Sequence, residues 1–297
     1  MIPALRSGDK IAIIATARKI TIPEIEVAIQ TFERWGLEVI TGQTIGASYN
    51  QFAGDDALRL QDLQQALDDA SIKAIICARG GYGTTRIIDQ VDFTGFRKHP
   101  KWIVGFSDVT ALLAHVQNLG LESIHAIMPV LFPKAGTADS IETLRRALFG
   151  EELHYEVAPH PFNRTGTATG PLVGGNLSML YTLTGTHSDV DTTGKILFLE
   201  DLDEYLYHVD RMLVHLDRNG KLANLAGLLI GDMSDMRDNA VPFGKTAYEI
   251  VLEHTGKYNY PVGYGFPTGH EPLNLALICG REAQLEVGEQ GAKLQYC

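Results

Sequence analysis

Apolar and polar residues follow one another in the first half of the chain in a pattern typical of alternating strands and helices. The short β-branched, apolar run at 10–16 predicts a buried parallel strand. Apolar side chains then recur at helical spacing after Pro23, which suits a first helical turn, until Gly36 ends the helix. The pattern continues with strands at 37–41, 72–78 and 101–106 and helices at 55–70 and 108–120. This order predicts an α/β fold, an open parallel sheet of the flavodoxin or Rossmann type.

The character of the chain changes near residue 134. Residues 135–165 hold one short helix followed by many Pro, Gly, Thr and Asn residues, which predicts a linker between domains. Short apolar runs separated by glycine turns then predict strands at 165–186, 195–204, 225–233, 260–270 and 283–296, with helices near 205–219 and 243–254. We therefore expect an α/β domain at 1–134 and a β-rich, mixed α+β domain with more antiparallel sheet at 166–297.

Composition narrows the class of protein. The chain has 297 residues, of which 45% are apolar and 21% charged, as in an ordinary folded protein. Its net charge of −11 and the lack of a basic cluster argue against a nucleic-acid partner. Three cysteines without paired spacing predict neither a disulfide framework nor a zinc site. The sequence has no signal-peptide pattern and no apolar stretch of membrane-spanning length, which predicts a soluble cytoplasmic protein without a membrane partner.

The loop "RGGYG" at 79–83 follows the third predicted strand, where ligands bind in open α/β sheets. Its glycines permit backbone conformations closed to other residues and let a ligand approach the main chain. Its N–H groups could bind an anion, although the loop matches neither the Walker motif nor GxGxxG. A tight turn between strand and helix is the alternative interpretation.

Ser107 follows the fourth predicted strand, in the stretch "VGFSDVT". It resembles half of the GxSxG nucleophile elbow, because Gly105 precedes it at the required spacing while Val109 departs from the second glycine. The competing interpretation is a helix N-cap serine with Asp108 in the first helical turn, which capping preferences alone favour. This stretch by itself leaves both interpretations open.

A serine nucleophile needs a base and a carboxylate that orients the base. His270 lies in the Gly- and Pro-rich loop "GYGFPTGHEPLN", from which a side chain can reach into a cleft. Glu200 ends an apolar strand, where a charge is costly unless a partner such as histidine pairs with it. His208 and His215, seven residues apart beside an acidic loop, suggest a metal site as an alternative. They lack HExxH spacing, so we expect no metal.

Six ordered blocks together resemble the LD-carboxypeptidase (muramoyltetrapeptide carboxypeptidase) family of serine peptidases, which includes the microcin C immunity peptidases. The blocks span nearly the whole chain: "RSGDKIAIIAT", "ARGGYGTTRIID", "WIVGFSDVTALL", "GPLVGGNLSML", "ILFLEDLDEYLYHVDRML" and "GFPTGHEPLNLAL". The resemblance implies that Ser107 is the nucleophile, His270 the general base and Glu200 the residue that orients it. It also implies an oxyanion hole formed by the backbone N–H groups of Gly81 and Asp108, no cofactor and a homodimer.

The chain departs from the family pattern at a few positions. The first strand runs into "ATAR" where the family usually has a Pro-Ser turn. Asp203 replaces a frequent glycine, and Leu275 and Ala276 replace a frequent Leu-Pro pair. None of these positions belongs to the implied triad. They leave the substrate subsite open, because in the family these loops line the cleft.

The substrate is implied by the same resemblance. The family removes a terminal D-amino acid from an L,D bond, typically the D-alanine of the murein tetrapeptide, during cell-wall recycling in the cytoplasm. An exopeptidase must recognise a terminal carboxylate, for which Arg79 and the adjacent Gly80 are candidates, although Arg79 also suits a surface salt bridge. Asn176 in "GGNLS" is a further substrate-binding candidate that also suits a structural turn.

Two other functions remain open at this stage. Within the family, the alternative is an immunity peptidase or amidase that acts on a peptide–nucleotide toxin, which a purine-stacking aromatic side chain would favour. Outside it, the alternative is a non-catalytic binding protein whose two domains close on a small ligand.

Overall fold

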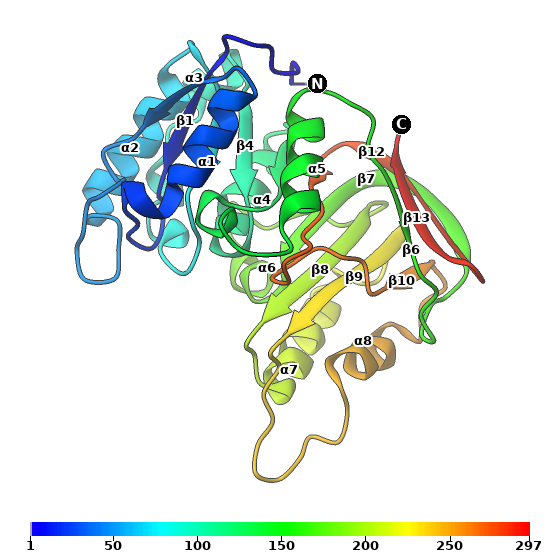
Figure 1. Ribbon diagram of the computed structural model, residues 1–297. Helices are drawn as coiled ribbons and strands as arrows, with labels where there is room; N and C mark the ends of the chain where they lie inside the picture. Colours follow the sequence, from blue (N-terminus) through cyan, green and yellow to red (C-terminus); the bar gives the residue numbers. More distant parts are fainter. Residues whose placement is uncertain (1) are drawn as a thin grey trace. The chain divides into compact units, whose positions relative to one another are not determined.

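The computed structural model describes residues 2–297 and divides into two compact units (Figure 1). The first unit comprises the chain up to Glu151 together with Leu275–Ile278. The second comprises Glu152–Asn274 and Cys279–Cys297. The predicted boundary at 134 lies before helix α5 (Ala138–Leu148), which belongs to the first unit; at its end Leu148 accepts a hydrogen bond from the N–H of Leu5.

The first unit is built on an open sheet with the strand order β11-β5-β4-β3-β1-β2. The run from β2 to β5 has the flavodoxin-like order, and the four strand pairings within it are all parallel, which confirms the predicted α/β fold class. The strands are β1 (Lys10–Ile14), β2 (Glu38–Thr41), β3 (Ile72–Cys77), β4 (Trp102–Gly105), β5 (Ser123–His125) and β11 (Leu277–Cys279).

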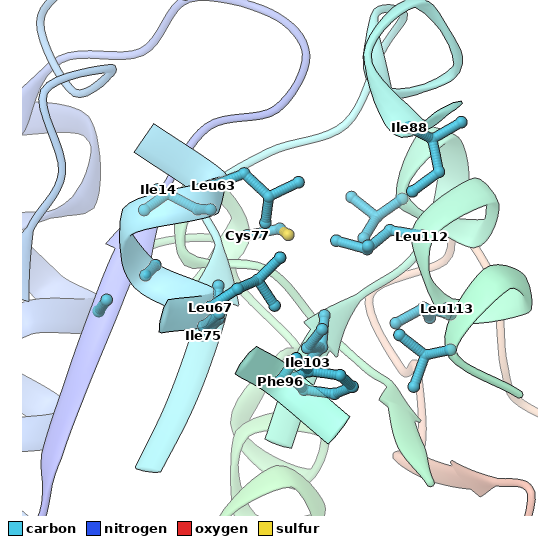
Figure 2. Close-up of a cluster of buried hydrophobic side chains, with 14 of the residues drawn as sticks. Ile14, Leu63, Leu67, Ile75, Cys77, Ile88, Phe96, Ile103, Leu112 and Leu113 are labelled. Carbon is cyan, nitrogen blue, oxygen red and sulfur yellow. The ribbon is translucent and has the colours of Figure 1, made fainter. Parts of the chain in front are cut away.

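The central strands of this sheet are apolar runs because both faces of the sheet are buried. The helices of the first unit are α5 and α1 (Ile22–Arg34), α2 (Asp56–Asp68), α3 (Thr94–Lys98) and α4 (Thr110–Asn118). Figure 2 shows part of the core, where Leu63 and Leu67 of α2, Ile75 and Cys77 of β3, and Leu112 of α4 are buried together. Each of these side chains is at most 1% exposed, so the sheet is a rigid support for the loops at its carboxyl edge.

The segment after the glycine loop differs from the predicted helix. It forms two 3₁₀ turns, η1 (Thr84–Arg86) and η2 (Ile88–Gln90), rather than an α-helix. The reason lies in the backbone: Gly83 enters η1 with a φ of 151°, and the N–H of Thr84 is held by the side chain of Asp108. Two more 3₁₀ turns, η3 (Ser107–Val109) and η4 (Pro129–Leu131), follow β4 and β5.

The second unit contains a mixed sheet with the order β10-β9-β8-β7-β12-β13-β6. Its first four strands pair in parallel and the others pair antiparallel, so the predicted mixed, β-rich fold class is confirmed. The strands are β6 (His154–Val157), β7 (Gly166–Asn176), β8 (Ile196–Leu202), β9 (Gly227–Ser234), β10 (Val262–Tyr264), β12 (Glu282–Gly288) and β13 (Gly291–Tyr296).

Three helices belong to the second unit, one of which the sequence pattern missed. Helices α7 (Leu206–Arg218) and α8 (Ala247–Thr255) lie close to their predicted positions. Helix α6 (Leu177–Leu183) replaces part of the strand predicted over 165–186. It forms because Asn176 caps it, accepting a hydrogen bond from the N–H of Met179, and because every third residue is a buried leucine. In residues 2–297 no helix has both the length and the apolar character needed to cross a bilayer.

Candidate active site

Ser107 sits where β4 ends, at the carboxyl edge of the parallel sheet. Its backbone φ is 61°, in the left-handed region that residues other than glycine rarely adopt. Helix α4 begins at Thr110 with Val109 as its N-cap residue, so Ser107 is not in the position of a helix cap. A strand, a strained serine and a helix in succession are the geometry of a nucleophile elbow.

The departure from GxSxG is explained by the packing of Val109. A Cβ atom built on Gly105 would lie 2.7 Å from Cγ1 of Val109 and 3.0 Å from its Cβ. The turn is therefore tight enough that only one of the two positions can carry a side chain. Gly105 supplies the missing volume, and Val109 fills it as a core residue with no exposed surface.

The glycine loop lies against Ser107 in the same unit. A Cβ on Gly80 would stand 3.2 Å from Cβ and 3.3 Å from Oγ of Ser107, so this glycine leaves the hydroxyl uncovered on one side. Gly81 has a φ of 114°, and a Cβ there would overlap the side chain of Arg18. The conformation of the loop thus favours glycine at position 81, and the tight space beside Ser107 favours it at position 80.

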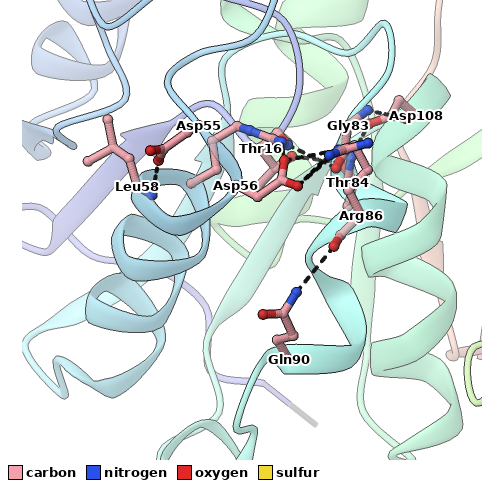
Figure 3. Close-up of polar contacts among 10 residues, drawn as sticks. Thr16, Asp55, Asp56, Leu58, Gly83, Thr84, Arg86, Gln90 and Asp108 are labelled. Atoms are coloured by element: carbon pink, nitrogen blue, oxygen red, sulfur yellow. Dashed lines mark hydrogen bonds and ion pairs between the residues drawn. The ribbon is translucent and has the colours of Figure 1, made fainter. Parts of the chain in front are cut away.

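Asp108 ties the glycine loop to the serine turn. Its carboxylate accepts hydrogen bonds from the N–H groups of Gly83 at 3.2 Å and Thr84 at 2.9 Å, as Figure 3 shows. The side chain is 2% exposed, and burial raises the pKa of Asp108, although these hydrogen bonds act in the opposite direction. The residue after Ser107 therefore positions the loop beside it.

Arg59 of α2 also supports the loop, a contact that no pattern in the sequence indicates. Its guanidinium donates to the carbonyl oxygens of Thr16 at 2.6 Å and Gly83 at 2.9 Å and also pairs with Asp56. Its side chain is fully buried, and its guanidinium joins the segment that follows β1 to the glycine loop that follows β3. An arginine on an amphipathic helix predicts an exposed position, so only the structure identifies this contact.

In the second unit, His270 pairs with the buried Glu200, and the His270 side chain is 12% exposed. Nδ1 of His270 lies 2.7 Å from Oε2 of Glu200. Glu200 is the third residue from the end of β8 and has no exposed surface. Burial lowers the pKa of His270, but the carboxylates around it, Glu200 first among them, together raise it more, so the net shift is upward. A carboxylate on Nδ1 leaves Nε2 as the nitrogen that can take a proton from a nucleophile.

Asp201, next to Glu200 in the chain, is a second buried carboxyl group. It accepts hydrogen bonds from Nδ2 of Asn176 at 2.9 Å and from the N–H of Ser178 at 2.8 Å. Burial and the neighbouring Glu200 raise the pKa of Asp201 to about 7. Asn176 is thus engaged in holding α6 against β8, which corresponds to the turn interpretation of this residue.

The remaining predicted residues have ordinary structural partners. Arg79 donates to the carbonyl oxygen of Lys19 at 3.2 Å and lies 3.9 Å from Glu24, a weak, largely exposed pair. His208 lies 2.5 Å from Glu204, and His215 contacts the ring of Tyr181 at 4.9 Å between centroids. Across residues 2–297, no group of three or more His, Cys, Asp or Glu side chains is arranged to hold a metal ion.

Two family models match this chain. The model described as the LD-carboxypeptidase N-terminal domain matches residues 11–126, and the model described as the LD-carboxypeptidase C-terminal domain matches residues 169–285. The first match contains Ser107 and the glycine loop, and the second contains Glu200 and His270.

Individual proteins are similar over the full length. A probable murein peptide carboxypeptidase of Bacillus subtilis is 38% identical over 98% of this chain and 93% of its own. The crystal structure of muramoyltetrapeptide carboxypeptidase from Oxalobacter formigenes superposes with a TM-score of 0.88 at 28% identity, covering 97% of this chain and 98% of its own. The microcin C7 self-immunity protein MccF in complex with aspartyl sulfamoyl adenosine has a TM-score of 0.87 at 20% identity, covering 99% and 97%, which is a likeness of fold.

Proposed function

Because the chain belongs to the LD-carboxypeptidase family, peptidase family S66, we propose that it is a serine carboxypeptidase that releases the terminal D-alanine of a murein tetrapeptide. The family makes the chain a peptidase, that is, a hydrolase of peptide bonds. The observation that supports the finer proposal most is the buried Glu200–His270 pair at 2.7 Å, combined with a serine held at a φ of 61°. The relatives whose names specify murein peptides supply the substrate.

In the proposed reaction, Oγ of Ser107 attacks the carbonyl carbon of the scissile L,D bond while Nε2 of His270 accepts the hydroxyl proton. Glu200 keeps the proton of Nδ1 in place and stabilises the imidazolium. The imidazolium then gives its proton to the amino group of the leaving D-alanine, and the acyl group stays on Ser107. Water, deprotonated by His270, releases the shortened peptide and restores the serine.

Negative charge on the carbonyl oxygen requires donors that are already in place. We assign this role to the backbone N–H groups of Gly81 and Asp108, because the loop of Gly81 lies against Ser107 and Asp108 follows it. Each such donor typically contributes roughly 3–4 kcal/mol to transition-state stabilisation. The side chain of Asp108, by holding Gly83 and Thr84, fixes the loop before the substrate arrives.

Recognition of the terminal carboxylate is assigned to Arg79 and Gly80. Within residues 2–297, Arg79 has a long contact with Glu24 and a hydrogen bond to one carbonyl oxygen, so a substrate carboxylate could replace Glu24 as the partner of its guanidinium. Asn176 has a structural role in capping α6, and any contact with substrate would be additional. The family resemblance further supports a homodimer in the cytoplasm and a reaction without a cofactor.

The test is the release of D-alanine from a murein tetrapeptide by the wild type and by Ser107→Ala. The variant should lose at least about 10³-fold in kcat, because removing the nucleophile leaves only binding and the oxyanion donors. Ser48→Ala, which removes an exposed hydroxyl, is the matched control and should keep full activity. Undiminished turnover by Ser107→Ala would refute the proposal.

The same preparation distinguishes the toxin-directed alternative. An aspartyl sulfamoyl adenosine, the kind of molecule bound in the MccF structure, is assayed beside the tetrapeptide. We expect kcat/KM to favour the tetrapeptide, and a peptide that ends in L-alanine should be a poor substrate. A ratio that favours the nucleotide compound would assign the protein to the immunity function instead.

A further inference from the structure

The pairing of β8 with β9 is interrupted beside Glu200. Leu199 pairs with Ile230, but two residues later Asp201 pairs with Met233, so β9 contains one extra residue at this point. Gly231 and Asp232 therefore oppose the single residue Glu200. Bulges of this kind are rare between parallel strands, and they re-aim side chains next to active sites.

Two glycines show what the bulge brings together. A Cβ on Gly231 would overlap the carbonyl oxygen of Thr268 and lie 3.2 Å from Cβ of Glu200, so this position lies between the His270 loop and Glu200 and has no room for a side chain. A Cβ on Gly269 would lie 3.1 Å from Oε2 of Glu200, 3.0 Å from Cβ of Asp232 and 3.2 Å from its Oδ2. Gly269 has a φ of 140° and directly precedes His270. The His270 loop therefore approaches both carboxyl groups at a residue that has no side chain.

Each of the two carboxyl groups has one unsatisfied oxygen. Oε1 of Glu200 and Oδ2 of Asp232 are both buried and lack a hydrogen-bond partner within residues 2–297. A buried, unpartnered carboxylate oxygen is costly, and natural structures keep one mainly where it serves a function. Asp232 thus has no complete structural explanation, in contrast to Asp201, which accepts hydrogen bonds from three groups.

We propose that Asp232 is a positioning residue of the Glu200–His270 pair, placed by the β9 bulge so that its charge acts on the imidazole without contact with the substrate. The proposal rests on the assignment of His270 as general base. It adds to Glu200 a further acidic group, not adjacent in sequence, that affects how strongly His270 holds a proton.

The charges around the pair agree with this role. Burial, with the neighbouring carboxyl group of Glu271, raises the pKa of Asp232 to about 7, so the group changes charge near neutral pH. His270 is faced by Glu200 and Asp201 from β8 and by Asp232 from β9, and all three carboxylates raise its pKa. From α8, the hydroxyl of Tyr248 donates to the carbonyl oxygen of Gly231 at 3.0 Å, and its pKa is raised to about 12, so it stays neutral.

The consequence is a dependence of catalysis on the charge of Asp232. Above pH 7 its carboxylate stabilises the imidazolium that forms during attack, and below that pH its neutral form does not. The variant Asp232→Asn keeps the shape and removes the charge. Its kcat/KM should match that of the wild type within about threefold at pH 6 and fall roughly tenfold below it at pH 8.5.

A second measurement does not depend on turnover. In the Ser107→Ala background, the pKa of His270 is followed by NMR of the imidazole with and without Asp232→Asn. We expect removal of the carboxylate to lower the pKa of His270 by at least about half a unit. Glu286→Gln, an exposed charge removal on β12 whose carboxylate acts on Lys293, is the control and should leave that pKa unchanged.

The outcomes separate the proposals. An activity loss in Asp232→Asn that is the same at every pH, with an unchanged pKa of His270, would make Asp232 merely structural and overturn this inference. A variant that does not fold at pH 8.5 is tested at the pH values where its circular dichroism matches the wild type. The role of Ser107 is judged by its own variant, so failure of the one does not hide failure of the other.

Discussion

The positive φ of Ser107 allows a quantitative test of the nucleophile elbow through stability. In the left-handed region, a residue with a Cβ costs roughly 1–2 kcal/mol relative to ordinary conformations, whereas glycine has no such cost. Relative to alanine, glycine lowers the free energy of unfolding by about 0.4–1 kcal/mol, because it increases the conformational entropy of the unfolded chain. We therefore expect Ser107→Gly to be more stable than Ser107→Ala by about 1 kcal/mol, although neither variant has a nucleophile.

Gln30 supplies the matched comparison. It is exposed in the middle of α1, in the same unit, where glycine is less stable than alanine by about 1 kcal/mol. The glycine variant should therefore be less stable than the alanine variant at position 30 and more stable than it at position 107. The four variants are compared by thermal unfolding of the full chain, in which 1 kcal/mol corresponds to roughly 2–4 °C in Tm.

The result that would refute the reasoning is simple. If Ser107→Gly is no more stable than Ser107→Ala while the Gln30 pair behaves as expected, the serine does not occupy a strained backbone conformation. The elbow interpretation would then lose its structural basis.

Two further predictions concern buried acids. Asp108→Ala should lower the free energy of unfolding by about 3 kcal/mol and reduce kcat, because the buried N–H groups of Gly83 and Thr84 lose their acceptor. The control Asp55→Ala, which removes an exposed helix cap, should cost only about 1 kcal/mol and leave kcat unchanged. Urea unfolding and D-alanine release measure the two effects, and equal effects of the two variants would contradict the role of Asp108 in holding the loop. Asp201 and Asp232 have pKa values of about 7, above the usual 3.8, so their contribution to stability is complete below pH 4 and is lost as the pH rises through 7. Tm should consequently fall between pH 5 and pH 8, and Asp232→Asn should make that fall smaller; a Tm that rises over this window would count against the raised pKa values.

Much of the first unit follows from the sequence because its strands are buried on both faces and its helices are amphipathic. The alternation of such runs gives the order of strands and helices directly, and it places the glycine loop and Ser107 after neighbouring strands. Periodicity cannot distinguish a helix N-cap from a nucleophile elbow at Ser107, because both require a small polar residue after a strand. Backbone φ separates them, and φ depends on the packing of Val109 against Gly105.

The helix α6 was missed for a related reason. Its residues follow two glycines and contain Thr and Tyr, which favour strand, so local preference pointed away from helix. The cap at Asn176 outweighs that preference because Asp201, 25 residues later, holds the amide side chain and the N–H of Ser178. A contact at that separation leaves no periodic signal.

Arg59 and Asp232 illustrate what sequence patterns cannot supply even when the fold is recognised. Arg59 reads as a surface residue of α2, and Asp232 reads as an ordinary polar residue at a strand end. Contacts distant in sequence set their positions. The guanidinium of Arg59 binds the carbonyl oxygens of Thr16 and Gly83, and one extra residue in β9 places Asp232 beside the bulge that opposes Glu200. Arg59 contacts the glycine loop in one unit, and Asp232 is our proposed positioning residue for His270 in the other. It follows that the groups to which we assign the chemistry are visible in motifs, whereas the groups that contact or surround them are found only in the folded structure.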